Sequence, residues 1–116
     1  MNSQNAENYI NQIKNANINI AANLQYKIID KMKDLTDKAY EDIKHVNLML
    51  TAIIVNGDEW PMDKTSRWLG FAQAKLVEHN IITIDEERDR TREIFHNVYR
   101  ENGLNVPETI DLYSKK

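Results

Sequence analysis

The chain of 116 residues contains no cysteine, and this absence removes several classes of protein. Without thiols there is no disulfide framework, no cysteine nucleophile and no zinc site built from cysteines. The N-terminal residues MNSQNAENYI lack the basic start and apolar run of a signal peptide, and no apolar stretch approaches the length of a membrane span. We therefore expect a soluble, cytoplasmic protein with no membrane partner.

Basic residues are also too few for a general nucleic-acid-binding protein. The formal net charge is -3, whereas general nucleic-acid binders usually carry a clear basic surplus. All five arginines lie beyond Gly57, so a local basic patch remains open. With 41% hydrophobic residues, the composition fits one globular domain, which we expect to span residues 1–116.

Glycine and proline are scarce, and neither occurs between Ser3 and Asn56. Apolar residues recur there at steps of three and four, close to the helical period of about 3.6. This pattern predicts one very long helix, or two helices in series, over residues 1–56. Asparagine has poor helix propensity, so we expect a kink or a break in the segment 15–23, NANINIAAN.

The helix start and stop signals in residues 57–104 predict a helical hairpin. Asn56 and Gly57 tolerate the left-handed conformation that ends a helix, and Pro61 fits the first turn of the next, which we expect to reach residues 78–79. A third helix begins with a capping box, Thr83 and Glu86, and ends with Gly103 as the left-handed residue of a Schellman turn. Residues 105–116 are expected to form an extended C-terminal tail. The predicted fold class is all-α, a helical bundle.

The lengths of these helices favour an oligomer. A helix of fifty residues would be about 75 Å long, whereas each shorter helix would span only about 27 Å. Either the N-terminal part folds back in the asparagine-rich segment, or a second copy of the chain buries the uncovered apolar stripe. We expect a homo-oligomer.

The segment RWLGF, residues 67–71, places large apolar residues on two sides of the second helix. A helical wheel assigns Leu69 to the core arc and Trp68 to its edge, whereas Gly70, Phe71 and Ala74 fall on a second strip. Small residues four apart allow close approach of another backbone. The strip is therefore a candidate interface with a protomer or a ligand, unless the second helix simply has two buried faces.

The third helix carries arginines on or beside its apolar arc. A guanidinium in such a place needs a partner, and Asp42 is the natural candidate for an ion pair with Arg88. The alternative is an anion pocket, because arginine binds phosphate through two hydrogen bonds and aromatic rings can stack a base. The candidate ligand-binding residues are Arg67, Trp68, Arg88, Arg92, His96 and Tyr99.

Acidic residues recur at helical spacing at Asp30, Asp34, Asp37 and Glu41, which could indicate magnesium ligands. The wheel places these carboxylates opposite the apolar stripe, interleaved with lysines, so a solvated face is favoured. The histidines have no metal-ligand spacing, and no phosphate loop or nucleophile elbow occurs. We therefore predict no catalytic residues, no metal ligands and no cofactor.

With RWLGF and the capped segment TIDEERDRTREIF both in place, residues 59–103 resemble a segment of small accessory proteins of tailed bacteriophages. The resemblance implies a phage or prophage origin but no specific activity. It leads to two binding hypotheses: an oligomer that sequesters a nucleotide-derived defence signal, or an inhibitor that grips a host protein through the Phe71 strip or the long helix. A metal-dependent nucleotide hydrolase is the third.

Overall fold

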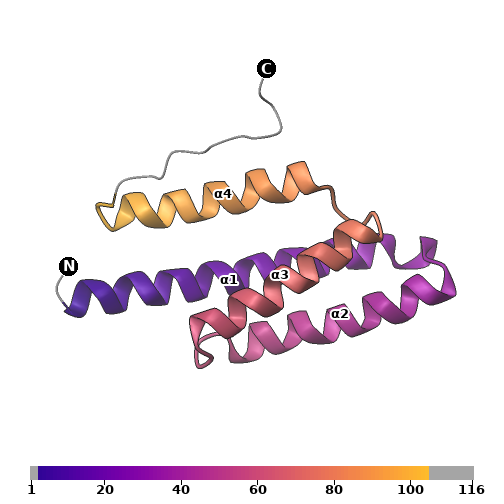
Figure 1. The fold of residues 1–116 in the computed structure, drawn as a ribbon, viewed down its shortest axis with the longest axis horizontal. Helices are drawn as coiled ribbons and strands as arrows, with labels where there is room; N and C mark the ends of the chain where they lie inside the picture. Colours follow the sequence, from indigo (N-terminus) through magenta and orange to yellow (C-terminus); the bar gives the residue numbers. More distant parts are fainter. Residues whose placement is uncertain (1–2, 105–116) are drawn as a thin grey trace, which may run out of the picture.

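Figure 1 follows the chain through the computed structural model, which describes residues 3–104. The elements are the helices α1 (Ser3–Lys31), α2 (Asp37–Asn56), α3 (Met62–Glu78) and α4 (Ile84–Glu101), with a 3-10 helix η1 (Met32–Asp34) after α1. No strand occurs within residues 3–104, so the all-α prediction is confirmed. The predicted tail, residues 105–116, lies outside the described residues.

The N-terminal half is two helices that meet at residues 32–36, not in the asparagine-rich segment. α1 continues through residues 15–23, so the predicted break there is wrong, whereas the kink stays a prediction. The turn forms where Leu35 becomes extended, with φ −89° and ψ 146°. Thr36 then caps α2, because its side-chain oxygen accepts a hydrogen bond from the Ala39 amide at 3.2 Å.

Tertiary packing explains why the asparagine-rich segment stays helical. Ala16, Asn17, Ile20 and Ala21 are all at most 4% exposed. Burial of the apolar side chains of Ala16, Ile20 and Ala21 favours the helix, whereas the propensity deficit of asparagine relative to alanine is at most about 0.7 kcal/mol per residue. The sequence suggested a weak place, but these small side chains form a packing surface.

α1 is the central element of the bundle. Figure 1 shows α2 on one side of it and α4 on the other, with α3 crossing α1 obliquely. α2 runs back antiparallel to α1 and covers its apolar stripe, which removes the main reason for expecting an oligomer; the homo-oligomer itself stays a prediction. The buried cluster is formed by Ile20, Ala21, Leu24, Ile28, Ile43, Val46, Leu50, Ile53, Leu69, Ala72, Leu76, Ile81 and Ile82.

Gly57 has a different role from the one predicted. Its φ of −58° is right-handed, so it does not end α2 through the left-handed conformation. A Cβ at this position would lie 2.6 Å from the Ile53 carbonyl oxygen and 2.7 Å from Cγ1 of Ile18. Glycine is needed because α1 packs directly against the end of α2.

α3 and α4 both end in a turn closed by a left-handed residue. In α4, Thr83 accepts a hydrogen bond from the Glu86 amide, and Gly103 is left-handed with φ 69°. The Leu104 amide bonds to the Tyr99 carbonyl at 2.9 Å, which confirms the predicted Schellman turn. α3 ends in the same way, with Asn80 taking the left-handed position at φ 61°.

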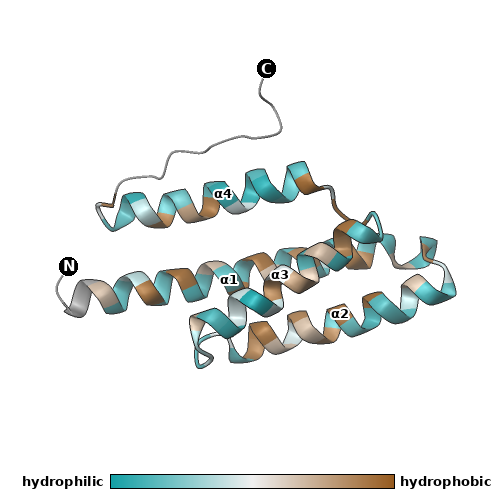
Figure 2. Ribbon diagram, viewed as in Figure 1, coloured by the Kyte–Doolittle hydropathy of each residue, from teal (hydrophilic) through white to brown (hydrophobic). Residues whose placement is uncertain are grey.

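α4 lies against α1 more than against α3, so residues 57–104 are not a closely packed hairpin. Figure 2 shows α4 as largely hydrophilic. Its buried residues are Glu87 and Val98, whereas the apolar Ile84 is 61% exposed. Within residues 3–104, no helix combines the length and apolar character needed to cross a membrane.

Candidate functional site

A cleft of about 430 Å³ lies between α3 and α4. α4 contacts α1, where Tyr99 stacks on Tyr9 and Gln12 bonds to Glu101, and this leaves the facing sides of α3 and α4 partly apart. The surface of the cleft is mainly apolar. It is lined by Gln73, Ala74, Val77, Ile84, Glu87, Arg88 and Thr91.

A buried carboxylate connects the two helices in this cleft. Glu87 on α4 is 7% exposed, and its Oε2 accepts a hydrogen bond from Gln73 Nε2 on α3 at 2.5 Å. Arg90 donates to the other carboxylate oxygen. These two donors offset the cost of burying the charge, so Glu87 holds α4 to α3.

The predicted interface strip borders the cleft. Phe71 is 47% exposed, and Lys75 Nζ lies 6.0 Å from the centre of its ring. Gly70 is exposed, and a Cβ there would meet no atom of the described chain within 4 Å. Ala74, one turn after Phe71, lines the cleft itself. The strip and the cleft therefore form one continuous surface.

Two of the predicted ligand-binding residues lie elsewhere on α3. Arg67 is exposed and pairs with Asp63 at 3.8 Å. Trp68 packs edge-on against Trp60, with ring centres 4.9 Å apart, and Lys64 Nζ lies over both rings at 5.5 and 4.1 Å. Both rings also contact the core, so Trp68 serves the α3 core face.

Three others lie along α4 and are not among the residues that line the cleft. Arg92 pairs with Asp89 at 3.9 Å. His96 lies 6.4 Å from the Tyr99 ring, and Tyr99 stacks on Tyr9 of α1 at 6.2 Å. Burial, followed by the neighbouring Tyr99, raises the pKa of Tyr9. This aromatic contact attaches the C-terminal part of α4 to α1.

Arg88 is the one predicted ligand residue among those that line the cleft. Its guanidinium donates to Asp85 Oδ1 at 3.2 Å, one turn earlier on α4. The predicted Arg88–Asp42 pair is wrong, because Asp42 Oδ2 instead contacts His79 Nε2 at 3.1 Å. α4 lies on the other side of α1 from α2, which carries Asp42.

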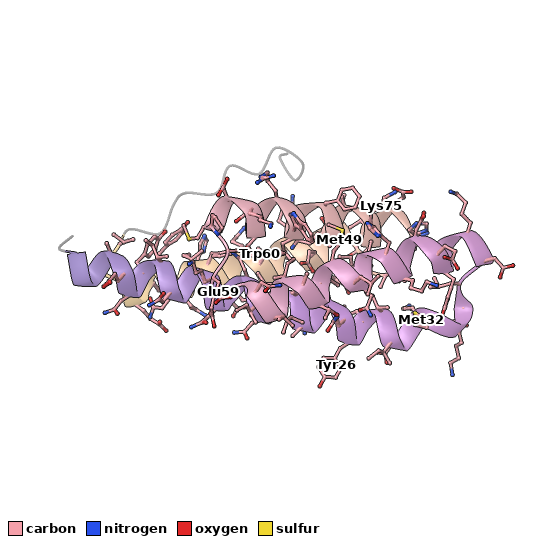
Figure 3. All side chains as sticks on the ribbon, turned by 90° about the horizontal axis from the view of Figure 1, so that it is seen from below. Tyr26, Met32, Met49, Glu59, Trp60 and Lys75 are labelled. Carbon is pink, nitrogen blue, oxygen red and sulfur yellow. The ribbon has the colours of Figure 1, made fainter. Side chains whose placement is uncertain are left out.

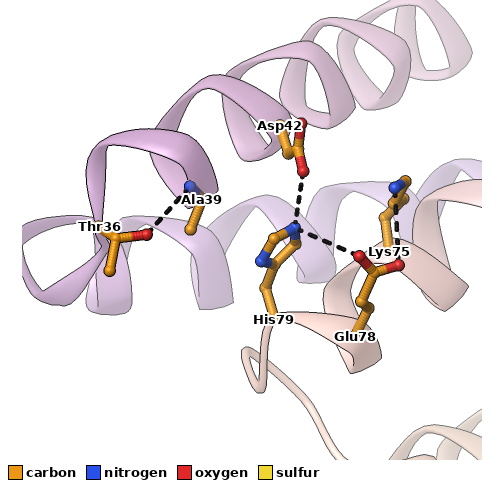
Figure 4. Close-up of polar contacts among 6 residues, drawn as sticks. All are labelled: Thr36, Ala39, Asp42, Lys75, Glu78 and His79. Carbon is orange, nitrogen blue, oxygen red and sulfur yellow. Dashed lines mark hydrogen bonds and ion pairs between the residues drawn. The ribbon is translucent and has the colours of Figure 1, made fainter.

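The acidic residues form two groups with different surroundings. Asp30, Asp34, Asp37 and Glu41 are exposed, in agreement with the predicted solvated face. Elsewhere, Asp42, Glu78 and His79 meet where α2 contacts the end of α3, as Figure 4 shows. Sequence spacing did not reveal this group, because Asp42 lies 37 residues before His79 in the chain.

Comparisons with family models, with curated proteins and with solved structures return no match. The resemblance to phage accessory proteins therefore stays a prediction, and the geometry of the site carries the functional argument.

Proposed function

We propose that this chain is a non-enzymatic binding protein, and that its α3–α4 cleft takes the apolar face of an amphipathic helix from a partner protein. The observation that carries the proposal is the mainly apolar cleft of about 430 Å³, continuous with the exposed Phe71 strip. Amphipathic helices bind such grooves through apolar anchors spaced three and four residues apart. Exposed apolar surface of this kind often marks a protein interface.

Charge indicates which helix would fit. Arg88 lines the cleft, and Lys75 stands beside Phe71 at its edge. Both are already paired, with Asp85 and Glu78, so their attraction for a new partner is moderate. Acidic residues flanking the apolar face of the partner helix would complement these cations, and basic residues would be repelled by them.

A nucleotide-derived ligand has less support. Five of the six residues predicted to bind it are absent from the cleft lining within residues 3–104, and the surface there is mainly apolar. Hydrolysis by the residues of the acidic face has less support still, because these carboxylates are exposed. If the chain is of phage origin, the partner is a host protein and the binding is inhibitory.

Selection from a displayed library of helical peptides tests the proposal and needs no assumption about the identity of the partner. The wild-type protein is expected to enrich peptides with apolar residues on one face and acidic residues beside it. Ala74→Arg should weaken the binding of these peptides about tenfold or more, since the new side chain fills the cleft. Arginine is a good helix former, so α3 should remain folded.

Tyr26→Arg is the matched control. Tyr26 is 73% exposed on α1, and Figure 3 shows it on the opposite edge of the molecule from Lys75. This variant should bind the selected peptides as well as the wild type does. Peptides that bind Ala74→Arg with unchanged affinity, a preference for basic peptides, or the lack of any enrichment would overturn the proposal.

A further inference from the structure

Three potential metal ligands converge at the contact between α2 and the end of α3. His79 Nε2 lies 3.1 Å from Asp42 Oδ2 and 4.0 Å from Glu78 Oε2. One ligand atom from each residue lies within 4.8 Å of the others. In Figure 4 the three side chains point toward one another across the helix contact.

These separations are close to those around a single ion. Nitrogen and oxygen ligands bind Zn²⁺ at about 2.0 to 2.2 Å, so neighbouring ligand atoms of a tetrahedral site lie about 3.3 to 3.6 Å apart. The Asp42–His79 distance is slightly shorter than this range, and the Glu78–His79 distance slightly longer. The Glu78 side chain is 59% exposed, so it can turn toward an ion at little cost.

The backbone holds the other two ligands in place. The His79 amide donates to the Lys75 carbonyl at 3.1 Å. One residue later the Schellman turn closes, with the Ile81 amide bonded to the Leu76 carbonyl at 2.9 Å. On α2, Asp42 precedes the fully buried Ile43. A site carried on rigid elements loses little conformational entropy when it binds an ion.

The local charges favour a cation. Asp42 and Glu78 together carry two negative charges, and Lys75 pairs with Glu78. Lys75 Nζ lies 3.5 Å from Glu78 Oε1, which leaves the other oxygen of Glu78 on the side of His79. One imidazole with two carboxylates suits a transition metal better than Mg²⁺ or Ca²⁺, which prefer oxygen ligands alone.

We propose that Asp42, Glu78 and His79 form a binding site for a divalent transition-metal ion, with Zn²⁺ as the best fit to this set of ligands. A simple His79–Asp42 pair explains the shortest contact, and Glu78 would then pair with Lys75 through one oxygen while its other oxygen lies unused near His79 Nε2. An ion would require all three residues. It would cross-link α2 to α3 next to the turn that leads into α4.

The test is a titration of chelator-treated protein with Zn²⁺ in a calorimeter, together with thermal unfolding. We expect one ion per chain and a rise in melting temperature with Zn²⁺ concentration, since an ion that binds only the folded state stabilises it. Glu78→Gln should weaken binding about tenfold or more, and His79→Gln should abolish it. Circular dichroism checks that each variant is folded.

His45→Gln is the control, because His45 is an exposed histidine on α2. It should bind Zn²⁺ as the wild type does. The ¹⁵N resonances of the imidazoles give a second readout, in which Zn²⁺ should shift those of His79 and not those of His45. Wild-type protein that binds no Zn²⁺ with saturation, or affinity unchanged by Glu78→Gln or His79→Gln, would overturn this site.

Discussion

Asn80 has the one left-handed backbone conformation outside glycine in residues 3–104, with φ 61°. It ends α3, directs Ile81 and Ile82 into the core, and directly follows His79. Asparagine tolerates this conformation better than other residues with a side chain, since its short polar group can form local hydrogen bonds. A single residue therefore sets both the end of a helix and the position of a candidate ligand.

Substitution of Asn80 should separate backbone strain from side-chain contacts. Asn80→Ala should lower the free energy of unfolding by about 1 kcal/mol, because the alanine Cβ is unfavourable at positive φ. Asn80→Gly should be neutral or slightly stabilising. Urea unfolding measures both changes. If the alanine variant is as stable as the wild type, the left-handed turn does not limit the stability of this end of α3.

At the level of elements, α1 combines a poor local helix signal with extensive burial. Its asparagine-rich segment contains Ala16, Asn17 and Ala21, each nearly inaccessible to solvent. α2, α3 and α4 all contact α1, and Figure 1 shows α2 and α4 on opposite sides of it. Small residues are needed here because three helices pack around one.

Enlarging one of these small residues should destabilise the bundle. Ala21→Leu adds volume at a position that is 0% exposed, and overpacking of this kind costs about 1 to 3 kcal/mol. Asn23→Leu is the control, since Asn23 is exposed on the same helix and leucine is the better helix former. Urea unfolding should show a loss for Ala21→Leu and none for Asn23→Leu. Equal stabilities would contradict the role of α1 as a close packing surface.

At the scale of the whole molecule, α4 is the least anchored helix of the bundle. It buries Glu87 and Val98, whereas α2 buries Ile43, Val46, Leu50 and Ile53. The cleft separates much of α4 from α3. A helix with few buried apolar residues opens at lower free energy than the core helices. The element that forms one wall of the proposed binding cleft is thus the one best able to adjust to a ligand.

Hydrogen exchange tests this difference in anchoring. Amides in the middle of α4 should exchange at least about tenfold faster than those in the middle of α2, because α4 can detach without unfolding the core. Val98→Ala should increase exchange in α4 further and leave α2 almost unchanged. Equal protection of α2 and α4 in the wild type would show that the two helices open together.

The all-helical fold class, α3 and the capped α4 could be predicted from the sequence, because their signals are local. Apolar spacing, the Thr83 cap and Gly103 act within a few residues, so they do not depend on what packs nearby. The separation of Phe71 from the core face of α3 could also be predicted from a helical wheel. In each case the chemistry that decides the structure lies within one or two turns.

The position of the fold-back, the cleft and the Asp42–His79 contact depend on tertiary structure alone. Burial overrode the poor helix propensity of residues 15–23, and the fold-back occurs instead where Thr36 caps α2. The cleft exists because α4 packs on α1 rather than closely on α3, and Asp42 meets His79 because α2 and α3 lie side by side. These features depend on contacts between residues far apart in the chain, which no local pattern encodes.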